Sequence, residues 1–323
     1  MSIFALAAVA LIACALPSKA AGPSPNQIKR LVTFGDSYSD VVMAADNGTA
    51  WPVWCAIYGN LTLYPFARSG ATCSQTLTPR IFPAIFESQL PTYFAEVANH
   101  SISVPPEETV YTLWIGTNDV GVGEIIDGQQ NPGVTLVNTV QCKMDWITTL
   151  YNSGARNFVM QNASGDMLNL QDVILYQADS YPNRYWTAER NTSEWHIFMT
   201  ELVASANKLT ELMLNGLAPT LPGTHIGLFD SYKLFTDIRD HPAKYLSGTV
   251  PFNVTGAISS CVYPLNSNVS AVTPHCTTVE GSAQDSYMWF DEIHPSQRSD
   301  WVLAREITAG INNQSSEFLT WLT

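Results

Sequence analysis

The sequence has 323 residues, 46% of them hydrophobic and 11% aromatic, so the chain can bury a large core and disorder is not expected. Its 28 acidic and 15 basic residues give a formal net charge of −13, which would repel nucleic acid and anionic membranes at long range. We therefore expect no nucleic-acid partner and no stable membrane association.

The chain begins with an apolar run that ends in small residues, the pattern of a secretory signal peptide, although a positively charged start is absent. The run is too short to span a bilayer comfortably, and no later stretch approaches that length. We expect residues 1–21 to be removed and the mature protein to be secreted into the extracellular space. Eight glycosylation sequons support export, and they begin at Asn47, Asn60, Asn99, Asn162, Asn191, Asn253, Asn268 and Asn313.

Short apolar runs rich in Val, Ile, Leu, Phe and Tyr predict β-strands at Arg30–Phe34, Thr109–Ile115, Asn157–Gln161 and His225–Phe229. Helical periodicity lies between and after them, at Glu87–Ala98, Val134–Tyr151, Ser193–Leu217 and Ser296–Ile311. Strands that alternate with helices favour a mostly parallel sheet covered on both faces, which is a three-layer α/β fold. Ligands should then bind at the carboxyl ends of the strands.

Two stretches interrupt this alternation. Trp51–Pro83 is loop-like and carries two cysteines, and Lys244–Met288 is rich in Ser, Thr, Asn, Pro and Val. We interpret both as surface insertions. Because no low-complexity linker and no internal repeat divides the chain, we expect residues 22–323 to form a single domain.

The cysteines predict two disulfide bonds at most. Removal of the leader takes Cys14 with it and leaves an odd set, which allows two bridges and one thiol. Local spacing favours Cys55 with Cys73 and Cys261 with Cys276. Cys142, inside an apolar helical pattern, would then be a buried thiol. The alternative that all five are reduced conflicts with export.

A serine follows the first predicted strand directly, in the turn Gly35-Asp36-Ser37. At the carboxyl end of a strand, the Ser37 hydroxyl can project into a cleft while its own amide faces the same space. Gly-Asp-Ser is also ordinary turn chemistry, so a purely structural turn is the alternative.

Two further segments could supply hydrogen-bond donors. Gly116-Thr117-Asn118-Asp119 follows another predicted strand, and the Asn118 amide could donate to a developing oxyanion, or the segment could merely cap a helix. In the loop Arg68-Ser69-Gly70, Gly70 offers an unhindered backbone amide, although a loop glycine often serves only its turn.

Asp291 and His294 lie three residues apart, just before the last predicted helix. On one turn, this spacing lets the carboxylate accept from one imidazole nitrogen while the other points toward a nucleophile. An isolated Asp-x-x-His is more often a surface pair. The pair is therefore a hypothesis that needs the serine as its partner.

In this order the four segments resemble the blocks of the SGNH hydrolases, also called GDSL esterases and lipases, over most of the mature chain. In that family a Ser, a His and an Asp form the catalytic triad. The resemblance implies a flavodoxin-like α/β/α fold and a serine carboxylesterase with Ser37, Asp291 and His294 as catalytic residues. It also implies an oxyanion hole made of the Ser37 and Gly70 amides and the Asn118 side chain.

The stretches Thr33–Asp40, Trp51–Trp54 and Trp114–Val120 look most like fungal acetyl esterases of carbohydrate esterase family sixteen. That similarity implies removal of acetyl groups from hemicellulose oligosaccharides. Position 38 departs from the wider family, since Tyr38 replaces the leucine of the GDSL name. We expect this position to shape the turn rather than the chemistry.

Trp51 and Trp54 follow the nucleophile segment and are candidate cleft residues, because a flat apolar ring can stack on a sugar; core packing is the alternative. His241, flanked by Asp237 and Asp240, could form another acid–base pair, but it follows no strand that ends in glycine. It serves as a control for His294.

No His-Glu-x-x-His, Cys-x-x-Cys or phosphate-binding glycine loop occurs, so no metal and no cofactor are expected. We expect a monomer whose partner is a small-molecule or oligosaccharide ester. Two alternatives stay open. A lipase or phospholipase of the same family would need an exposed apolar surface near the cleft. A secreted carbohydrate-binding protein without turnover would use the same scaffold, because fold does not fix function.

Overall fold

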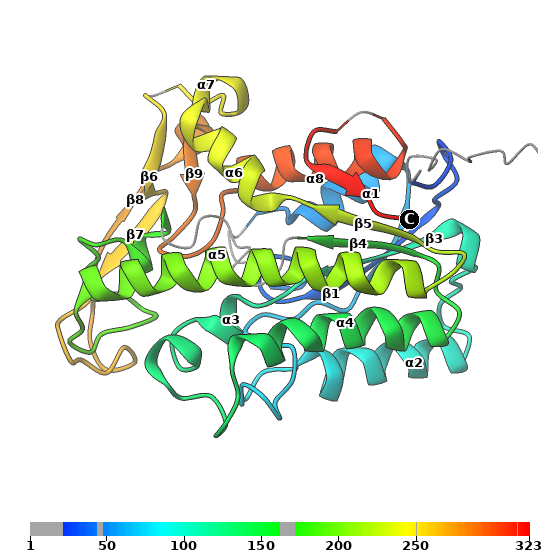
Figure 1. The fold of residues 1–323 in the computed structure, drawn as a ribbon. Helices are drawn as coiled ribbons and strands as arrows, with labels where there is room; N and C mark the ends of the chain where they lie inside the picture. The colour runs from blue at the N-terminus through cyan, green and yellow to red at the C-terminus, as the bar shows by residue number, and fades with distance from the viewer. Residues whose placement is uncertain (1–21, 44–47, 162–171, 250, 315) are drawn as a thin grey trace, which may run out of the picture.

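A computed structural model describes residues 22–43, 48–161, 172–249, 251–314 and 316–323 (Figure 1). The predicted leader 1–21, which includes Cys14, lies outside the described residues. So do the sequons at Asn47 and Asn162.

A six-stranded sheet in the order β10-β5-β4-β3-β1-β2 forms the middle layer. Five strands are parallel and β10 pairs antiparallel with β5, which confirms the prediction of a mostly parallel α/β sheet. The strands are β1 (Arg30–Gly35), β2 (Thr62–Pro65), β3 (Thr109–Trp114), β4 (Asn157–Gln161), β5 (His225–Phe229) and β10 (Leu319–Trp321). The four predicted strands are confirmed, and the two edge strands were not predicted.

Alternate side chains of the inner strands enter two separate cores. In β3, Val110 and Trp114 lie on one face of the sheet, whereas Tyr111 and Leu113 lie on the other, and all four are buried. Because both faces are covered, the strand is apolar at successive positions rather than at every second one. This is the pattern by which it was predicted.

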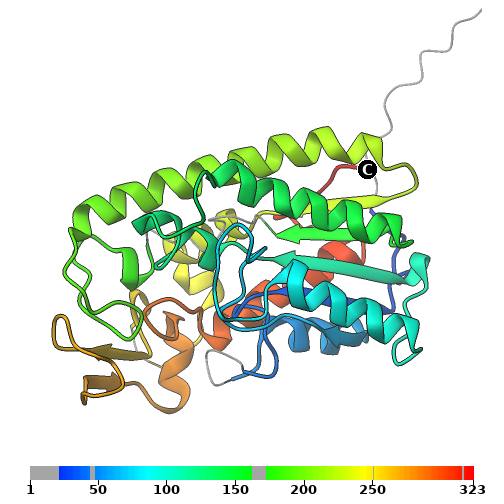
Figure 2. The same ribbon diagram turned by 90° about the horizontal axis from the view of Figure 1, so that it is seen from below.

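Helices cover both faces (Figures 1 and 2). In Figure 1, one face carries α1 (Trp51–Gly59), α6 (Ser231–Asp240) and α8 (Gln297–Ile311), and the other carries α2 (Leu90–Ala98), α4 (Leu136–Asn152) and α5 (Thr192–Leu217). The long helix α5 contributes buried residues to both cores. Two single-turn helices, α3 (Thr117–Val120) and α7 (Pro242–Tyr245), lie in connections. None of the described helices is long and apolar enough to cross a bilayer.

The helices predicted from periodicity are confirmed, and capping residues define their starts. Asn191 accepts a hydrogen bond from the Glu194 amide at the start of α5, and Ser296 accepts one from the Ser299 amide at the start of α8. The helix predicted from Glu87 begins instead with a π-turn at Ile85–Gln89, which leads into α2.

The interpretation of Trp51–Pro83 as a surface insertion is wrong. Its first part forms α1, which packs on α8, and β2 adds a strand to the edge of the sheet. Trp51 and Cys55 are fully buried. Helix α1 is apolar on most of its nine residues, so its sequence shows little of the polar and apolar alternation that identifies a helix.

The stretch Lys244–Met288 lies outside the main sheet. Its strands β6 (Asn253–Ala257), β7 (Ser259–Val262) and β8 (His275–Thr278) form two small sheets, one of them with β9 (Tyr287–Trp289). Figure 1 shows these strands gathered at one end of the molecule.

The disulfide prediction is half correct. Cys261 and Cys276 are paired, but Cys73 is bonded to Cys142 rather than to Cys55. Cys55 is the buried thiol, which accepts a hydrogen bond from Thr308, and burial raises its pKa to about 12. The reason is topological: helix α1 carries Cys55 to one face of the sheet, whereas Cys73 and Cys142 lie in the core on the other face.

We predict that replacing Cys73 and Cys142 together by alanine lowers the free energy of unfolding by about 4 kcal/mol, since their bond closes a loop over a sequence separation of 69. Cys55→Ala should cost only about 1 kcal/mol, the expense of a small cavity. Urea unfolding of the two variants measures both values. Equal losses would contradict the pairing.

Candidate active site

Ser37 lies directly after β1, at the carboxyl end of the sheet. The chain leaves the strand through Gly35, which has a positive φ of +152°. A Cβ atom added to Gly35 would lie 2.3 Å from the Trp114 carbonyl oxygen, so a larger residue is excluded at this position. The side-chain amide of the buried Gln89 binds this glycine at both ends: it accepts from the Gly35 N–H at 3.1 Å and donates to the Gly35 carbonyl at 2.8 Å. The turn before Ser37 is thereby fixed.

His294 and Asp291 lie in the connection from β9 to α8 and meet Ser37 from the far end of the sequence. The Oγ of Ser37 is 2.8 Å from Nε2 of His294, and Nδ1 of the same ring is 3.0 Å from Oδ1 of Asp291. Because Nδ1 faces the carboxylate, its proton is held there. Nε2 is left as the acceptor for the Ser37 hydroxyl.

The electrostatics keep Asp291 ionised. Burial by itself would raise its pKa, but the adjacent His294, the Tyr185 hydroxyl and the Ile293 amide outweigh that effect and hold the pKa at about 2. The backbone amides of Ile293 and His294 both donate to Oδ1, at 2.9 and 2.8 Å. A carboxylate so fixed can orient the imidazole and stabilise its charged form.

Hydrogen-bond donors surround the space in front of Ser37. In the described part of the chain, the backbone amides of Ser37 and Gly70 have no protein acceptor. Asn118 donates one Nδ2 proton to the Ala71 carbonyl at 2.8 Å, which leaves the second, and Arg80 donates to its Oδ1 at 2.7 Å. This arrangement can hold an oxyanion.

A buried carboxylate joins the serine turn to the glycine loop. Oδ2 of Asp40 accepts from the amide and hydroxyl of Ser69, at 2.8 and 2.9 Å, while Oδ1 accepts from the Val42 and Met43 amides. The two loops that carry Ser37 and Gly70 are therefore held at a fixed distance.

The catalytic candidates and the hydrogen-bond donors in front of Ser37 line a cleft of about 580 Å³. Its walls include Phe82, Val122 and Tyr176 beside the polar residues, and among the described residues it contains Ser37, Gly70, Asn118, Asp291 and His294, five of the sequence candidates. Among those same residues, no group of three or more His, Cys, Asp or Glu side chains is arranged to hold a metal ion.

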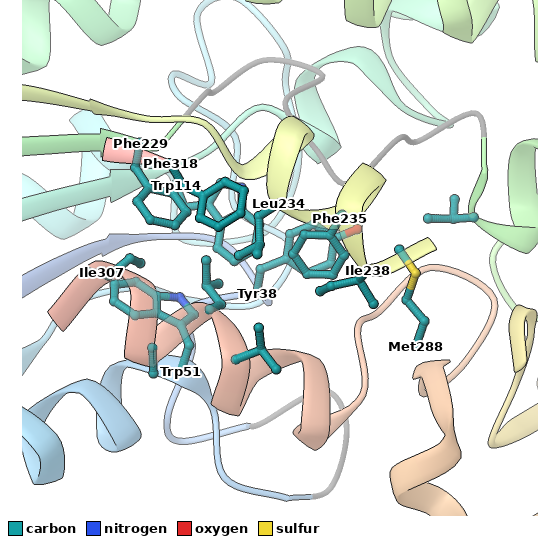
Figure 3. Packing of buried hydrophobic residues seen from close by; sticks show 14 of the residues in the cluster. Tyr38, Trp51, Trp114, Phe229, Leu234, Phe235, Ile238, Met288, Ile307 and Phe318 are labelled. Carbon is teal, nitrogen blue, oxygen red and sulfur yellow. The ribbon is translucent and has the colours of Figure 1, made fainter. Parts of the chain in front are cut away.

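The prediction that Trp51 and Trp54 line the cleft is wrong. Figure 3 shows Trp51 in the core beside Ile307 of α8, and its indole donates to Ser39 at 3.0 Å. Trp54 packs against the same core and stacks on Tyr58 at 6.1 Å between ring centroids. Both belong to α1, which the sequence did not reveal as a helix.

His241 is separate from the cleft. Its Nδ1 lies 2.9 Å from Asp237 Oδ1, so the pair suggested by spacing exists, but its side chain is 67% exposed. The spacing was therefore insufficient to identify an active-site histidine.

Sequence reasoning missed four residues of the site. Arg80 and Tyr185 contact candidate residues, Gln89 contacts the turn before Ser37, and Asp40 contacts Ser69 beside Gly70. Asp40 and Gln89 lie in segments that the sequence did indicate, but nothing in the pattern marked them as residues of the site. Arg80 and Tyr185 come from irregular segments. A contact between such segments has no signature in hydrophobic periodicity.

Asp36, the neighbour of Ser37, makes stability depend on pH. Burial raises its pKa from 3.8 to about 7, although the Tyr38 amide and His294 favour the charged form. The folded state therefore binds more protons than the unfolded state between about pH 4 and 7, and stability falls as the pH rises through that window.

We predict that Asp36→Asn reduces the loss of folding stability between about pH 4 and 7 by a few kcal/mol at most, since each pKa unit corresponds to about 1.4 kcal/mol. Asparagine keeps the acceptor for the Tyr38 amide but cannot ionise. Urea unfolding at pH 5 and pH 8 gives the difference. The exposed Asp179→Asn is the control, and an unchanged pH dependence in Asp36→Asn would refute the prediction.

Known proteins similar to this chain are mainly esterases. No protein-family model matches the chain. An acetylesterase of Hypocrea jecorina is 26% identical, over 93% of this chain and 93% of its own. A thermolabile hemolysin of Vibrio parahaemolyticus is 23% identical, over 92% of this chain and 67% of its own. An acetylxylan esterase structure from Geobacillus stearothermophilus is 12% identical with a TM-score of 0.45, covering 90% of this chain and all of that one.

The similarity to an acetylesterase covers nearly all of both chains. It agrees with the four ordered sequence blocks and with the observed sheet between two layers of helices. The chain is a serine carboxylesterase, and its four ordered blocks are similar to those of the SGNH hydrolases.

Proposed function

We propose that the protein hydrolyses acetyl esters through a covalent intermediate on Ser37, with His294 as the base and Asp291 as its partner. The observation that carries the proposal is the distance of 2.8 Å between Ser37 Oγ and His294 Nε2, with a carboxylate behind the ring. The acetylesterase relative supports acetyl as the acyl group.

The reaction follows from the geometry. His294 takes the hydroxyl proton as Ser37 attacks the carbonyl carbon, and the oxyanion is held by the Ser37 and Gly70 amides and Asn118. The imidazolium then gives its proton to the departing alcohol. Water repeats the sequence on the acetyl-enzyme, and acetate leaves.

We propose acetylated hemicellulose oligosaccharides as substrates, and a secreted, monomeric glycoprotein with one domain over residues 22–323. Five of the sequon asparagines have exposed side chains, as glycosylation requires: Asn60, Asn99, Asn191, Asn268 and Asn313. A buried contact supports one domain, because Glu292 beside the active site accepts from the Cys261 amide of β7 at 2.6 Å.

A fluorophosphonate label and a substrate panel test the proposal. We expect one adduct, on Ser37, and none in Ser37→Ala. Acetylated xylo-oligosaccharides should be deacetylated faster than simple alkyl acetates. Labelling of another residue would reject the mechanism. Faster turnover of the alkyl acetates would reject acetylated oligosaccharides as the preferred substrates.

A second candidate is hydrolysis of longer acyl esters. Apolar side chains are exposed at the cleft and beside it: Met43 (69%) and Phe82 (38%) line it, and their neighbours Val42 and Ile81 are 70% and 95% exposed. This is the surface that a lipase would need.

We predict that kcat/KM for 4-nitrophenyl acetate exceeds that for the palmitate by roughly tenfold or more, the discrimination that a short acyl pocket can supply. Ile81→Ser tests the apolar rim. Its control is Ile57→Ser, which changes another exposed isoleucine (60%) on α1. A preference for palmitate that Ile81→Ser reduces and Ile57→Ser does not would replace the acetyl assignment.

A further inference from the structure

Tyr185 lies against the acid end of the Ser37, His294 and Asp291 chain. Its hydroxyl donates to Oδ2 of Asp291 at 2.6 Å and lies 3.1 Å from Nδ1 of His294. A hydrogen bond of this length to an ionised carboxylate belongs to the strong class. We propose that Tyr185 is a positioning residue, which holds the Asp291 carboxylate and the Nδ1 proton of His294 in place; the inference rests on the proposed function.

The two carboxylate oxygens of Asp291 have different supports. Oδ1 accepts from two backbone amides as well as from the imidazole, so the local chain fixes it. Oδ2 has no backbone donor among the described residues; beyond the imidazole at 3.1 Å it has the Tyr185 hydroxyl and, at 4.0 Å, the Arg184 guanidinium. Tyr185 is thus the short contact that prevents rotation at Oδ2.

The phenol also favours the tautomer that the reaction needs. Since its proton is directed to Asp291, the Tyr185 oxygen presents a lone pair toward Nδ1 of His294, on the same side as the carboxylate. Two acceptors then share the Nδ1 proton. Burial and the negative charge of Asp291 raise the pKa of Tyr185 well above its ordinary value, so the phenol stays a donor.

Tyr185 is itself held before any substrate binds. Asn183, which is fully buried, accepts from the Tyr185 amide at 3.0 Å, and Asn183 and Trp186 exchange backbone hydrogen bonds. The Trp186 ring packs on Trp195 of α5, with 5.2 Å between ring centroids. A side chain on so constrained a turn can impose a geometry rather than follow one.

The test compares Tyr185→Phe with Tyr181→Phe. Both remove one hydroxyl from the same segment, but Tyr181 donates at 3.3 Å to Glu292, whose side chain forms no hydrogen bond with Ser37 or His294 in the described structure. We expect Tyr185→Phe to lower kcat about ten- to hundredfold with KM within twofold, the effect of losing a hydrogen bond to a charged group. Tyr181→Phe should leave both constants within twofold. Titrating active sites with the fluorophosphonate normalises the rates to folded enzyme.

A double-mutant cycle shows whether Tyr185 acts through Asp291. In an Asp291→Asn background, Tyr185→Phe should cost less than about twofold, because the group it positions is already lost. A full loss in that background, a raised KM with unchanged kcat, or unchanged kcat in Tyr185→Phe alone would each overturn the inference. Activity that survives Ser37→Ala would instead reject the proposed function itself.

Discussion

Ser37→Ala lowers kcat for acetate esters by roughly 10⁴-fold or more, which is the expected size when a triad nucleophile is lost. Alanine has no oxygen to attack the carbonyl, yet the cleft keeps its shape because Gln89 and Asp40 hold the surrounding turns through groups other than the serine. KM should change little. The measurement is steady-state hydrolysis of 4-nitrophenyl acetate by purified variant and wild type.

The kcat of His294→Ala should be about as low as that of Ser37→Ala, because the effects of residues that act as a unit are not additive. His241→Ala is the matched control: it also removes an imidazole from an aspartate, at 2.9 Å, but at an exposed position away from the cleft. Turnover that is lost in His241→Ala and kept in His294→Ala would show that the base has been misassigned.

The sheet could be predicted because its strands carry their evidence locally. Inner strands such as β3 and β4 are apolar on both faces, and α4 and α5 are long enough to show a period. The edge strand β10 has three residues, and β2 is only partly buried, so neither differs from a loop in composition.

The candidate site was predictable in part for a different reason. Ser37 and Asn118 follow strand ends, and parallel strands bring their carboxyl ends to one edge, so chain order alone predicts that they meet. Tyr185 and Arg80 depend on the path of irregular segments. The partner of Cys73 depends on which face of the sheet α1 covers, because α1 carries Cys55 away from Cys73. The spacing of cysteines along the chain does not contain that information.

Tyr38 makes contacts that the sequence did not predict, although it lies in the turn where the sequence placed it. Its replacement of leucine places a hydroxyl that donates to the Ile293 carbonyl at 2.7 Å, and its ring lies edge-on to His294 with centroids 5.5 Å apart. The residue therefore links the nucleophile turn to the histidine loop as well as filling the core (Figure 3).

Asn118→Ala is expected to lower kcat about 10²- to 10³-fold with little change in KM, as the loss of one preorganised oxyanion donor does elsewhere. The amide is oriented on both sides, since Arg80 donates to its oxygen and its nitrogen donates to the Ala71 carbonyl. Its remaining proton thus needs no reorientation when charge develops on the substrate. Steady-state kinetics on acetate esters measures the loss.

The exposed Asn215→Ala on α5 is the control for Asn118→Ala, because its amide also donates to a carbonyl, that of Glu211 at 2.8 Å. It should keep full activity. Asn118→Asp separates shape from donation, since it keeps the size of the side chain but replaces the donor by an oxygen that repels the oxyanion. Its kcat should be at least as low as that of Asn118→Ala, and a rate near wild type in Asn118→Asp would exclude Asn118 from the oxyanion hole.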